Sequence, residues 1–229
     1  MVEDYKLSVY SANMELVKSG LVTFTWGNAS AIDRAKGLVI IKPSGVAYDM
    51  MSPEDMTVVD LEGRIVEGRL KPSSDTPTHL VLYKAFPEIG GIAHFHSEFA
   101  TSWAQAGTDI PLLGTTHADY FAGDVPCTRE MTDKEIRGDY ERETGNVIVE
   151  RFTSGLLDPL QIPGVLVKNH GPFTWGESVA EAVFHAAVLE QVSKIAYFSH
   201  TLNRHYSMNS SLAEKHYSRK HGTGKYYGQ

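Results

Sequence analysis

The stretch Gly90-Gly91-Ile92-Ala93-His94-Phe95-His96 predicts a strand that carries two histidines on one face. Side chains alternate between the two faces of a strand, so His94 and His96 should point the same way while Phe95 points to the opposite, packed side. Two imidazoles at this spacing can bind one metal ion. An isolated His-x-His pair is, however, often two satisfied or surface histidines, so the prediction needs a further ligand from elsewhere in the chain.

A third histidine follows a second apolar run, in Val165-Leu166-Val167-Lys168-Asn169-His170-Gly171. His170 ends this run, and Asp75 adds a carboxylate candidate. Three histidine ligands with one coordination position left open are typical of a catalytic zinc centre and not of a closed structural one. Because manganese, cobalt and nickel also accept imidazole ligands, the pattern indicates a divalent transition metal without fixing which.

Outward from these motifs, strand patterns alternate with helix patterns. The apolar spacing of Leu7, Tyr10, Met14 and Val17 predicts an amphipathic helix over residues 3–19. Further helices are expected over 76–86 and 97–106 and from about residue 178, and strands over 38–41, 56–59, 64–66, 147–149 and 165–167. The alternation favours layered α/β architecture, and the hairpin-like spacing of the early strands favours a mixed sheet over a purely parallel one.

The composition limits the possible functions. The 229 residues suit one domain or at most two small ones, and the formal net charge of −7 argues against broad nucleic-acid binding. A single cysteine, Cys127, excludes an internal disulfide framework and suits a reducing cytoplasm. We expect no signal peptide and no membrane span. No dinucleotide fingerprint, P-loop or nucleophile elbow is present.

Three short polar segments with glycine, proline or serine are candidates for anion binding: Thr25-Trp26-Gly27-Asn28, Lys42-Pro43-Ser44-Gly45 and Lys71-Pro72-Ser73-Ser74-Asp75. Glycine permits close backbone approach, exposed N–H groups can form a nest for phosphate, and serine hydroxyls add donors. Each segment taken alone is more typical of an ordinary turn.

Several polar residues have both a structural and a functional interpretation. Asp75 precedes a predicted helix, so it is either an N-cap or a group at the metal. Asp119 lies in a loop-like stretch, where a solvated or turn-forming role is usual. Tyr226-Tyr227-Gly228-Gln229 has the character of a frayed end. His79 and His185 lie in predicted helices, where packing or exposure is expected before metal binding.

The chain resembles the class II aldolase/adducin-head family in TWGNAS, IKPSG, KPSSDTPTH, HFH, GTTHADYF, TGNVIVE, NHGPFTWG and KHYSRKHG…YYGQ. The KPSSDTPTH form and the YYGQ ending resemble the L-ribulose-5-phosphate 4-epimerases of that family. The resemblance implies one domain over residues 1–229, built as a three-layer αβα sandwich with a mixed, largely antiparallel sheet. It also implies a homotetramer in which the tail 207–229 reaches a neighbouring subunit's site.

The resemblance further implies roles for individual residues. His94, His96 and His170 would bind one divalent metal per subunit, most simply Zn²⁺ with Mn²⁺ or Co²⁺ as options, and Asp75 would lie at or next to it. Asp119 and a neighbour's Tyr227 would be acid/base groups, assisted by His216. The substrate and its phosphate would contact Gly27, Asn28, Ser44, Gly45, Ser73 and Ser74.

The implied reaction is interconversion of L-ribulose 5-phosphate and D-xylulose 5-phosphate by cleavage and re-formation of the C3–C4 bond. A retro-aldol route suits this change, because C4 is not adjacent to the carbonyl and direct proton abstraction there is awkward. The alternative enzyme is a class II sugar-phosphate aldolase that releases its fragments. Related fuculose-phosphate aldolases carry Glu at the position of Asp75, which favours the epimerase. A non-catalytic assembly protein, as in adducin heads, has no use for an open metal site.

Overall fold

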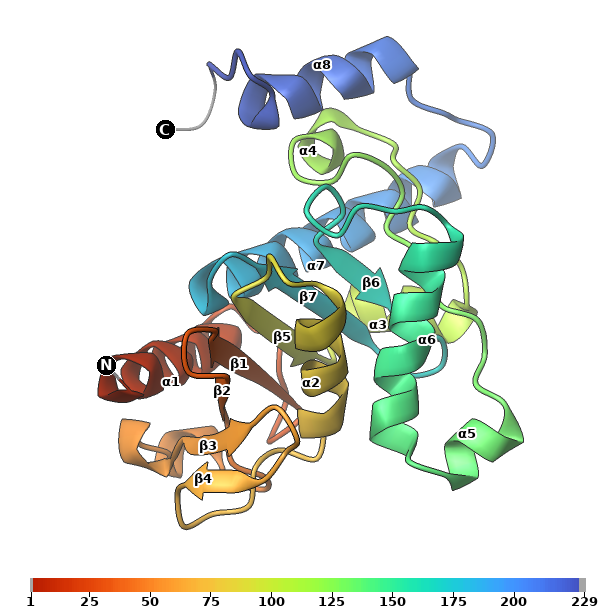
Figure 1. The fold of residues 1–229 in the computed structure, drawn as a ribbon. Helices are drawn as coiled ribbons and strands as arrows, with labels where there is room; N and C mark the ends of the chain where they lie inside the picture. The colour runs from red at the N-terminus through yellow and green to blue at the C-terminus, as the bar shows by residue number, and fades with distance from the viewer. Residues whose placement is uncertain (1, 227–229) are drawn as a thin grey trace.

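The computed structural model describes residues 2–226, and its centre is a sheet of seven strands in the order β4-β3-β2-β1-β5-β7-β6 (Figure 1). Every pair of neighbouring strands in this part of the chain is antiparallel. One isolated bridge, between Cys127 and Leu166, is parallel. The strands are β1 Gly27–Asp33, β2 Leu38–Ile41, β3 Thr57–Asp60, β4 Ile65–Glu67, β5 Gly91–Phe95, β6 Gly164–Leu166 and β7 Pro172–Gly176.

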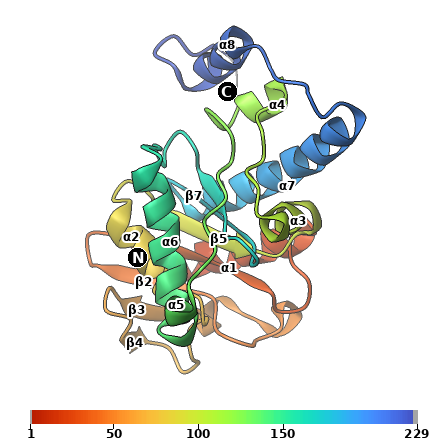
Figure 2. The same ribbon diagram turned by 90° about the vertical axis from the view of Figure 1, so that its right-hand side faces the viewer.

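Helices cover both faces of the sheet. They are α1 Val2–Lys18, α2 Thr76–Ala85, α3 Glu98–Ala106, α4 Thr115–Ala118, α5 Asp133–Arg137, α6 Tyr140–Ser154, α7 Val179–Leu202 and α8 Ser210–His221, with 3₁₀ turns η1 Tyr48–Met50 and η2 Pro53–Asp55. Helices α2 and α6 pack on one face, and α1 and α7 on the other (Figures 1 and 2). The expected three-layer α/β sandwich with a largely antiparallel sheet is therefore confirmed.

The alternation of side chains along β1 shows which helices meet which face. The Oγ of Ser30 lies 2.8 Å from the hydroxyl of Tyr83 in α2. One residue earlier, the backbone of Ala29 exchanges two hydrogen bonds with the side chain of Asn13 in α1, at 2.9 and 3.1 Å. Asn28 and Ser30 therefore face the α2 and α6 layer, and Ala29 faces α1.

The apolar run at 147–149 is a helix and not a strand, which corrects that prediction. These residues lie inside α6, where the buried positions 144, 145, 147, 148 and 152 follow helical spacing. The run packs against α2 at Gly145, where an added Cβ would lie 2.6 Å from the Cβ of Val81. Three consecutive apolar residues fit a strand or a helix equally well, so the longer pattern of burial was needed to separate them.

The other predicted elements match the structure within about two residues. The helix expected over 3–19 is α1, and those over 76–86 and 97–106 are α2 and α3. The strands that periodicity missed are β1 and β7, and the tail 207–229, for which no element was predicted, contains α8. In Figure 2, α8 packs with α4 at one end of the molecule, beyond the end of the sheet. No helix within residues 2–226 is long and apolar enough to cross a membrane.

The tight contact between α6 and α2 gives a stability test. Alanine normally favours a helix over glycine by roughly 1 kcal/mol, but at Gly145 the new methyl group meets Val81. We expect Gly145→Ala to destabilise the fold by about 1–3 kcal/mol in urea titration, because over-packing outweighs the gain in helix propensity. Asn146→Ala, at an exposed position of the same helix, is the matched control and should change stability little. Stabilisation by Gly145→Ala would contradict the packing.

Candidate metal centre and substrate cavity

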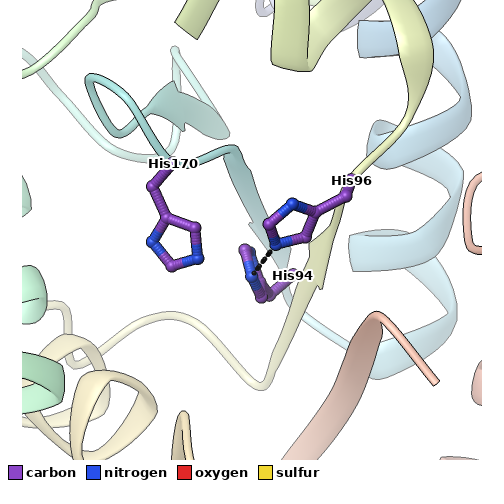
Figure 3. Close-up of side chains that lie close together, drawn as sticks. All are labelled: His94, His96 and His170. Carbon is purple, nitrogen blue, oxygen red and sulfur yellow. Dashed lines mark hydrogen bonds between the residues drawn. The ribbon is translucent and has the colours of Figure 1, made fainter. Parts of the chain in front are cut away.

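Three histidines converge at the end of β5. His94 lies in the strand and His96 directly follows it, while His170 comes from the turn that joins β6 to β7 (Figure 3). One ring nitrogen of each lies within 4.8 Å of those of the other two, and the Nε2 atoms of His94 and His96 are 3.0 Å apart. The strand prediction for His94 and His96 and the addition of His170 are thus consistent with one shared centre.

The turn before β7 places His170 next to the two histidines of β5 and its end. Asn169 adopts a positive φ of 64°, and the amide of His170 donates to the carbonyl of Val167 at 3.0 Å. Gly171 follows, with space for a Cβ limited by the carbonyl of Phe95 at 3.1 Å. The tight turn between two paired strands therefore sets the place of the third imidazole.

Hydrogen bonding and burial prepare these rings to bind a cation. The Nδ1–H of His94 donates to the carbonyl of Pro172 at 2.9 Å, which leaves its Nε2 lone pair facing the centre. Burial, with a smaller contribution from His96, lowers the pKa of His94 to about 3. Burial likewise lowers the pKa of His170 to about 3. Neutral imidazoles are the form that binds metals, so the rings are available at neutral pH.

The donor set fits a divalent transition metal. The Nδ1 of His170 is buried and has no hydrogen-bond partner in the described part of the chain. A buried polar atom without a partner is costly, and three neutral imidazoles within reach of one point are a typical ligand set for such an ion. Among the described residues, these histidines are the group of potential ligands that meets at one point.

A cavity of about 610 Å³ opens at the metal centre. The three polar segments singled out in the sequence all line it and contribute Gly27, Asn28, Ser44, Gly45, Ser73, Ser74 and Asp75. His94, His96 and His170 line the same cavity. The predicted substrate and metal residues are thus brought together, although they lie up to 143 positions apart, from 27 to 170.

The loops that hold the serines are tied to each other. The amide of Ser44 donates to the carbonyl of Lys71, and the amide of Ser73 donates to the carbonyl of Lys42, both at 2.9 Å. These two amides are therefore occupied, and an anion in the cavity would meet the serine hydroxyls and the neighbouring amides. Gly45, at a φ of 69°, adopts the left-handed conformation in the turn that follows Ser44.

Lys42 is a buried basic residue in the lining of the cavity. Its buried Nζ donates to the carbonyl of Val46 at 3.1 Å and lies 4.7 Å from the centre of the Tyr48 ring. The Tyr48 hydroxyl in turn donates to the carbonyl of Gly27 at 2.9 Å. Burial lowers the pKa of Lys42. Lys42 and Tyr48 thus connect two of the cavity's loops while adding a cationic group to its wall.

Asp75 occupies the N-cap position of α2, but its side chain makes no capping bond. Instead, its Oδ2 accepts a hydrogen bond from the Nδ2 of Asn28 at 2.6 Å. The carboxylate lines the cavity but is outside the group of atoms formed by the three histidines. In this structure Asp75 is therefore placed next to the metal centre and held there by Asn28.

Asp119 lies elsewhere, at the end of α4, and does not line this cavity. Its carboxylate accepts hydrogen bonds from the Nδ1 of His216 at 3.0 Å and from Arg219 at 2.8 and 3.1 Å. Burial raises the pKa of Asp119, but the bonds from Arg219 and His216 outweigh it and hold the pKa below its usual value. The proposed partner Tyr227 lies outside the described residues.

Sequence patterns missed two cavity residues at the start of α6. Tyr140 and Glu141 line the cavity together with the three polar segments. Burial raises the pKa of Tyr140, and the nearby Asp75 adds to the shift. A prediction of a helix that extends from the 147–149 run toward the N-terminus would have indicated them. The strand prediction for 147–149 excluded that helix.

The model of the class II aldolase and adducin N-terminal domain family matches residues 8–197. The L-ribulose-5-phosphate 4-epimerase UlaF of Salmonella paratyphi B (strain ATCC BAA-1250 / SPB7) is 54% identical over 229 residues, which is all of both chains.

Solved structures agree with the fold. An L-fuculose 1-phosphate aldolase superposes with a TM-score of 0.79 at 25% identity, covering 94% of this chain and 95% of that one. The L-fuculose 1-phosphate aldolase from Glaciozyma antarctica PI12 has a TM-score of 0.76 at 17% identity, covering 95% and 81%.

The metal centre can be tested without an activity assay. Wild-type protein dialysed with zinc should retain about one ion per chain, and His96→Ala should lose most of it, because two ligands hold the ion less well than three. His205→Ala changes an exposed histidine outside the cavity and is the matched control. Metal content measured by mass spectrometry would contradict the assignment if both variants bound zinc like the wild type.

Proposed function

The chain belongs to the class II aldolase and adducin N-terminal domain family, and we propose that it is a metal-dependent L-ribulose-5-phosphate 4-epimerase. The observation that carries the proposal is a single cavity lined by the three histidines and by all six predicted substrate residues. The full-length identity of 54% to a protein of that name supports the choice of reaction. The substrate pair would be L-ribulose 5-phosphate and D-xylulose 5-phosphate.

His94, His96 and His170 would hold one divalent metal per subunit, with Zn²⁺ the first choice and Mn²⁺ or Co²⁺ as alternatives. Such an ion, when bound, stabilises negative charge that develops on ketose oxygens during carbon–carbon bond cleavage. The imidazoles provide neutral lone pairs, and the Pro172 carbonyl keeps His94 in the required tautomer. Asp75 lies beside the centre as an acceptor that can orient a substrate hydroxyl.

The chain's own residues account for the other requirements of a retro-aldol route. A base removes the proton of the C4 hydroxyl as the C3–C4 bond breaks, which leaves a dihydroxyacetone enediolate and glycolaldehyde phosphate. The aldehyde must then rotate while its phosphate stays bound. We propose that the phosphate is bound by the hydroxyls of Ser44, Ser73 and Ser74 and by the amide of Gly45. Retention of the phosphate-bearing fragment is what separates epimerisation from aldol cleavage.

The two acid/base groups would come from a neighbouring subunit. Asp119 lies away from the cavity of its own chain, and Arg219 and His216 favour its ionised form, which can accept a proton. We therefore propose a homotetramer with sites at subunit interfaces, in which Asp119 and Tyr227 work from opposite sides of the aldehyde. The tail 207–229 would carry Tyr227 to that interface as part of the single domain 1–229. The single buried Cys127 suits a cytoplasmic location.

The second candidate is a class II sugar-phosphate aldolase, favoured by the structural likeness to an L-fuculose 1-phosphate aldolase. It would use the same metal and break the same kind of bond but release both fragments. Incubation of the zinc- or manganese-loaded protein with L-ribulose 5-phosphate separates the two. We expect D-xylulose 5-phosphate with little free glycolaldehyde phosphate by chromatography, and loss of turnover after chelation. Net accumulation of the free fragment would identify the aldolase, and full activity of metal-free protein would reject both.

The role of the tail has its own test. Tyr227→Phe removes one hydroxyl, and we expect kcat to fall at least about 100-fold because general acid–base catalysis is lost. The adjacent Tyr226→Phe is the matched control and should keep the wild-type rate, since Tyr226 is exposed. Thermal unfolding should be the same for both variants. An unchanged rate for Tyr227→Phe would remove this residue from the mechanism.

A further inference from the structure

A buried polar chain lies beneath the metal centre, between β1 and α2. Its members are Ser30, Tyr83 and His79, which are at most 1% exposed. The Oγ of Ser30 lies 2.7 Å from the Nδ1 of His79 and 2.8 Å from the hydroxyl of Tyr83. A buried polar chain of this kind is held in place by its hydrogen bonds, so its proton positions can be derived from them.

The two hydroxyls determine the tautomer of His79. If Tyr83 donates to Ser30, and Ser30 donates to the Nδ1 of His79, both hydroxyl protons are used. The reverse direction would leave the buried Tyr83 proton without an acceptor among the described residues, which is unfavourable. His79 therefore accepts at Nδ1 and carries its hydrogen on Nε2. That Nε2 is buried and has no hydrogen-bond partner within residues 2–226.

A matching acceptor without a partner lies nearby. The Oδ1 of Asn28 is also buried and unpartnered, while its Nδ2 donates to Asp75. Asn28 and Ser30 are on the same face of β1, two positions apart. Asp75 and His79 are one helical turn apart along α2. Strand β1 therefore meets α2 at two successive contacts, Asn28 with Asp75 and Ser30 with His79. The unpartnered Oδ1 belongs to the first contact, and the unpartnered Nε2–H belongs to the second.

Ring contacts show to which side of Ser30 the His79 ring extends. Its centre lies 6.0 Å from that of Phe173, which stacks on His94 with centres 4.1 Å apart. Phe173 pairs with His94 across the sheet, and His94 pairs with Asn28. The ring of His79 therefore reaches from the row of Ser30 toward the row that contains Asn28.

We propose that His79 is a positioning residue for the cavity, whose Nε2–H donates to the Oδ1 of Asn28 through one buried water. This bond fixes which end of the Asn28 amide faces Asp75. With His79 in place, the NH₂ group points to the carboxylate; after a flip, the amide oxygen would point to it and repel it. The chain from Tyr83 to His79 thereby holds Asp75 beside the metal centre.

The activity test uses two isosteric variants. His79→Asn keeps an acceptor near the Nδ1 position for Ser30 but removes the Nε2–H donor, whereas His79→Gln places an amide donor near the Nε2 position. We expect kcat/KM for the epimerisation to fall about tenfold to 100-fold in His79→Asn, as for other residues that support metal-site groups, and to recover in part in His79→Gln. Equal, unchanged rates in both variants would overturn the proposal.

A double-mutant cycle separates positioning from simple packing. In an Asn28→Ala background there is no amide to orient, so adding His79→Asn should change kcat/KM by less than about twofold. A packing role predicts the same penalty in both backgrounds, and that result would overturn the proposal. Metal content and thermal unfolding, measured on all four proteins, identify any variant that fails through folding.

This inference rests on the proposed function only for its kinetic readout, so a substrate-free measurement completes the test. NMR of protein labelled with ¹⁵N in histidine should show His79 as the Nε2–H tautomer, and the Asn28 side-chain amide signals should shift in His79→Asn. An Nδ1–H tautomer would overturn the inference whatever the enzyme does. The expected tautomer and shift in a protein without epimerase activity would support the inference and reject the proposed function.

Discussion

The register of β5 between β1 and β7 is the constraint on which the site depends. His94 pairs with Asn28 on one side and with Phe173 on the other, so a candidate metal ligand, a cavity residue and the ring stacked on the candidate ligand form one row across the sheet. A slip of β5 by one residue would turn its side chains, His94 among them, to the opposite face. The buried residues that enforce the register, such as Phe95 toward α7 and Ile92 toward α2, therefore also position the imidazoles.

This register requires a close backbone approach at the cavity. Gly27, with a φ of 118°, pairs with Phe95, and a Cβ there would lie 2.8 Å from the carbonyl of His94. A side chain at this position would force β1 and β5 apart at the point where the histidines emerge. The strand pairing therefore requires glycine at position 27, whether or not this residue also contacts an anion. The pairing of β1 with β5 thus positions both the histidines and the first polar segment of the cavity.

The sequence predicts the local part of this arrangement better than the distant part. The period of two residues is enough to place His94 and His96 on one face, because it depends on strand geometry alone. His170 could be associated with them but not located, since its position depends on a turn with Asn169 at positive φ. The β7 strand, Pro172–Gly176, was missed because it begins with proline and ends with glycine, residues that interrupt strand patterns. Resemblance to a family supplied Asp119, but its separation from the cavity of its own chain emerges only in three dimensions.

The separation of Asp119 from the histidines also has a physical consequence for catalysis. A carboxylate among three buried imidazoles would add a ligand and close the coordination position that the substrate needs. At the end of α4, Asp119 instead meets Arg219 and His216 of α8, which favour its charged form without involving the metal centre. Under the proposed function, the charge-stabilising and proton-transferring groups would thus lie on different elements of the chain. In the function that we propose, a second copy of the chain would bring the two together, and assembly would then control when a proton acceptor reaches the cavity.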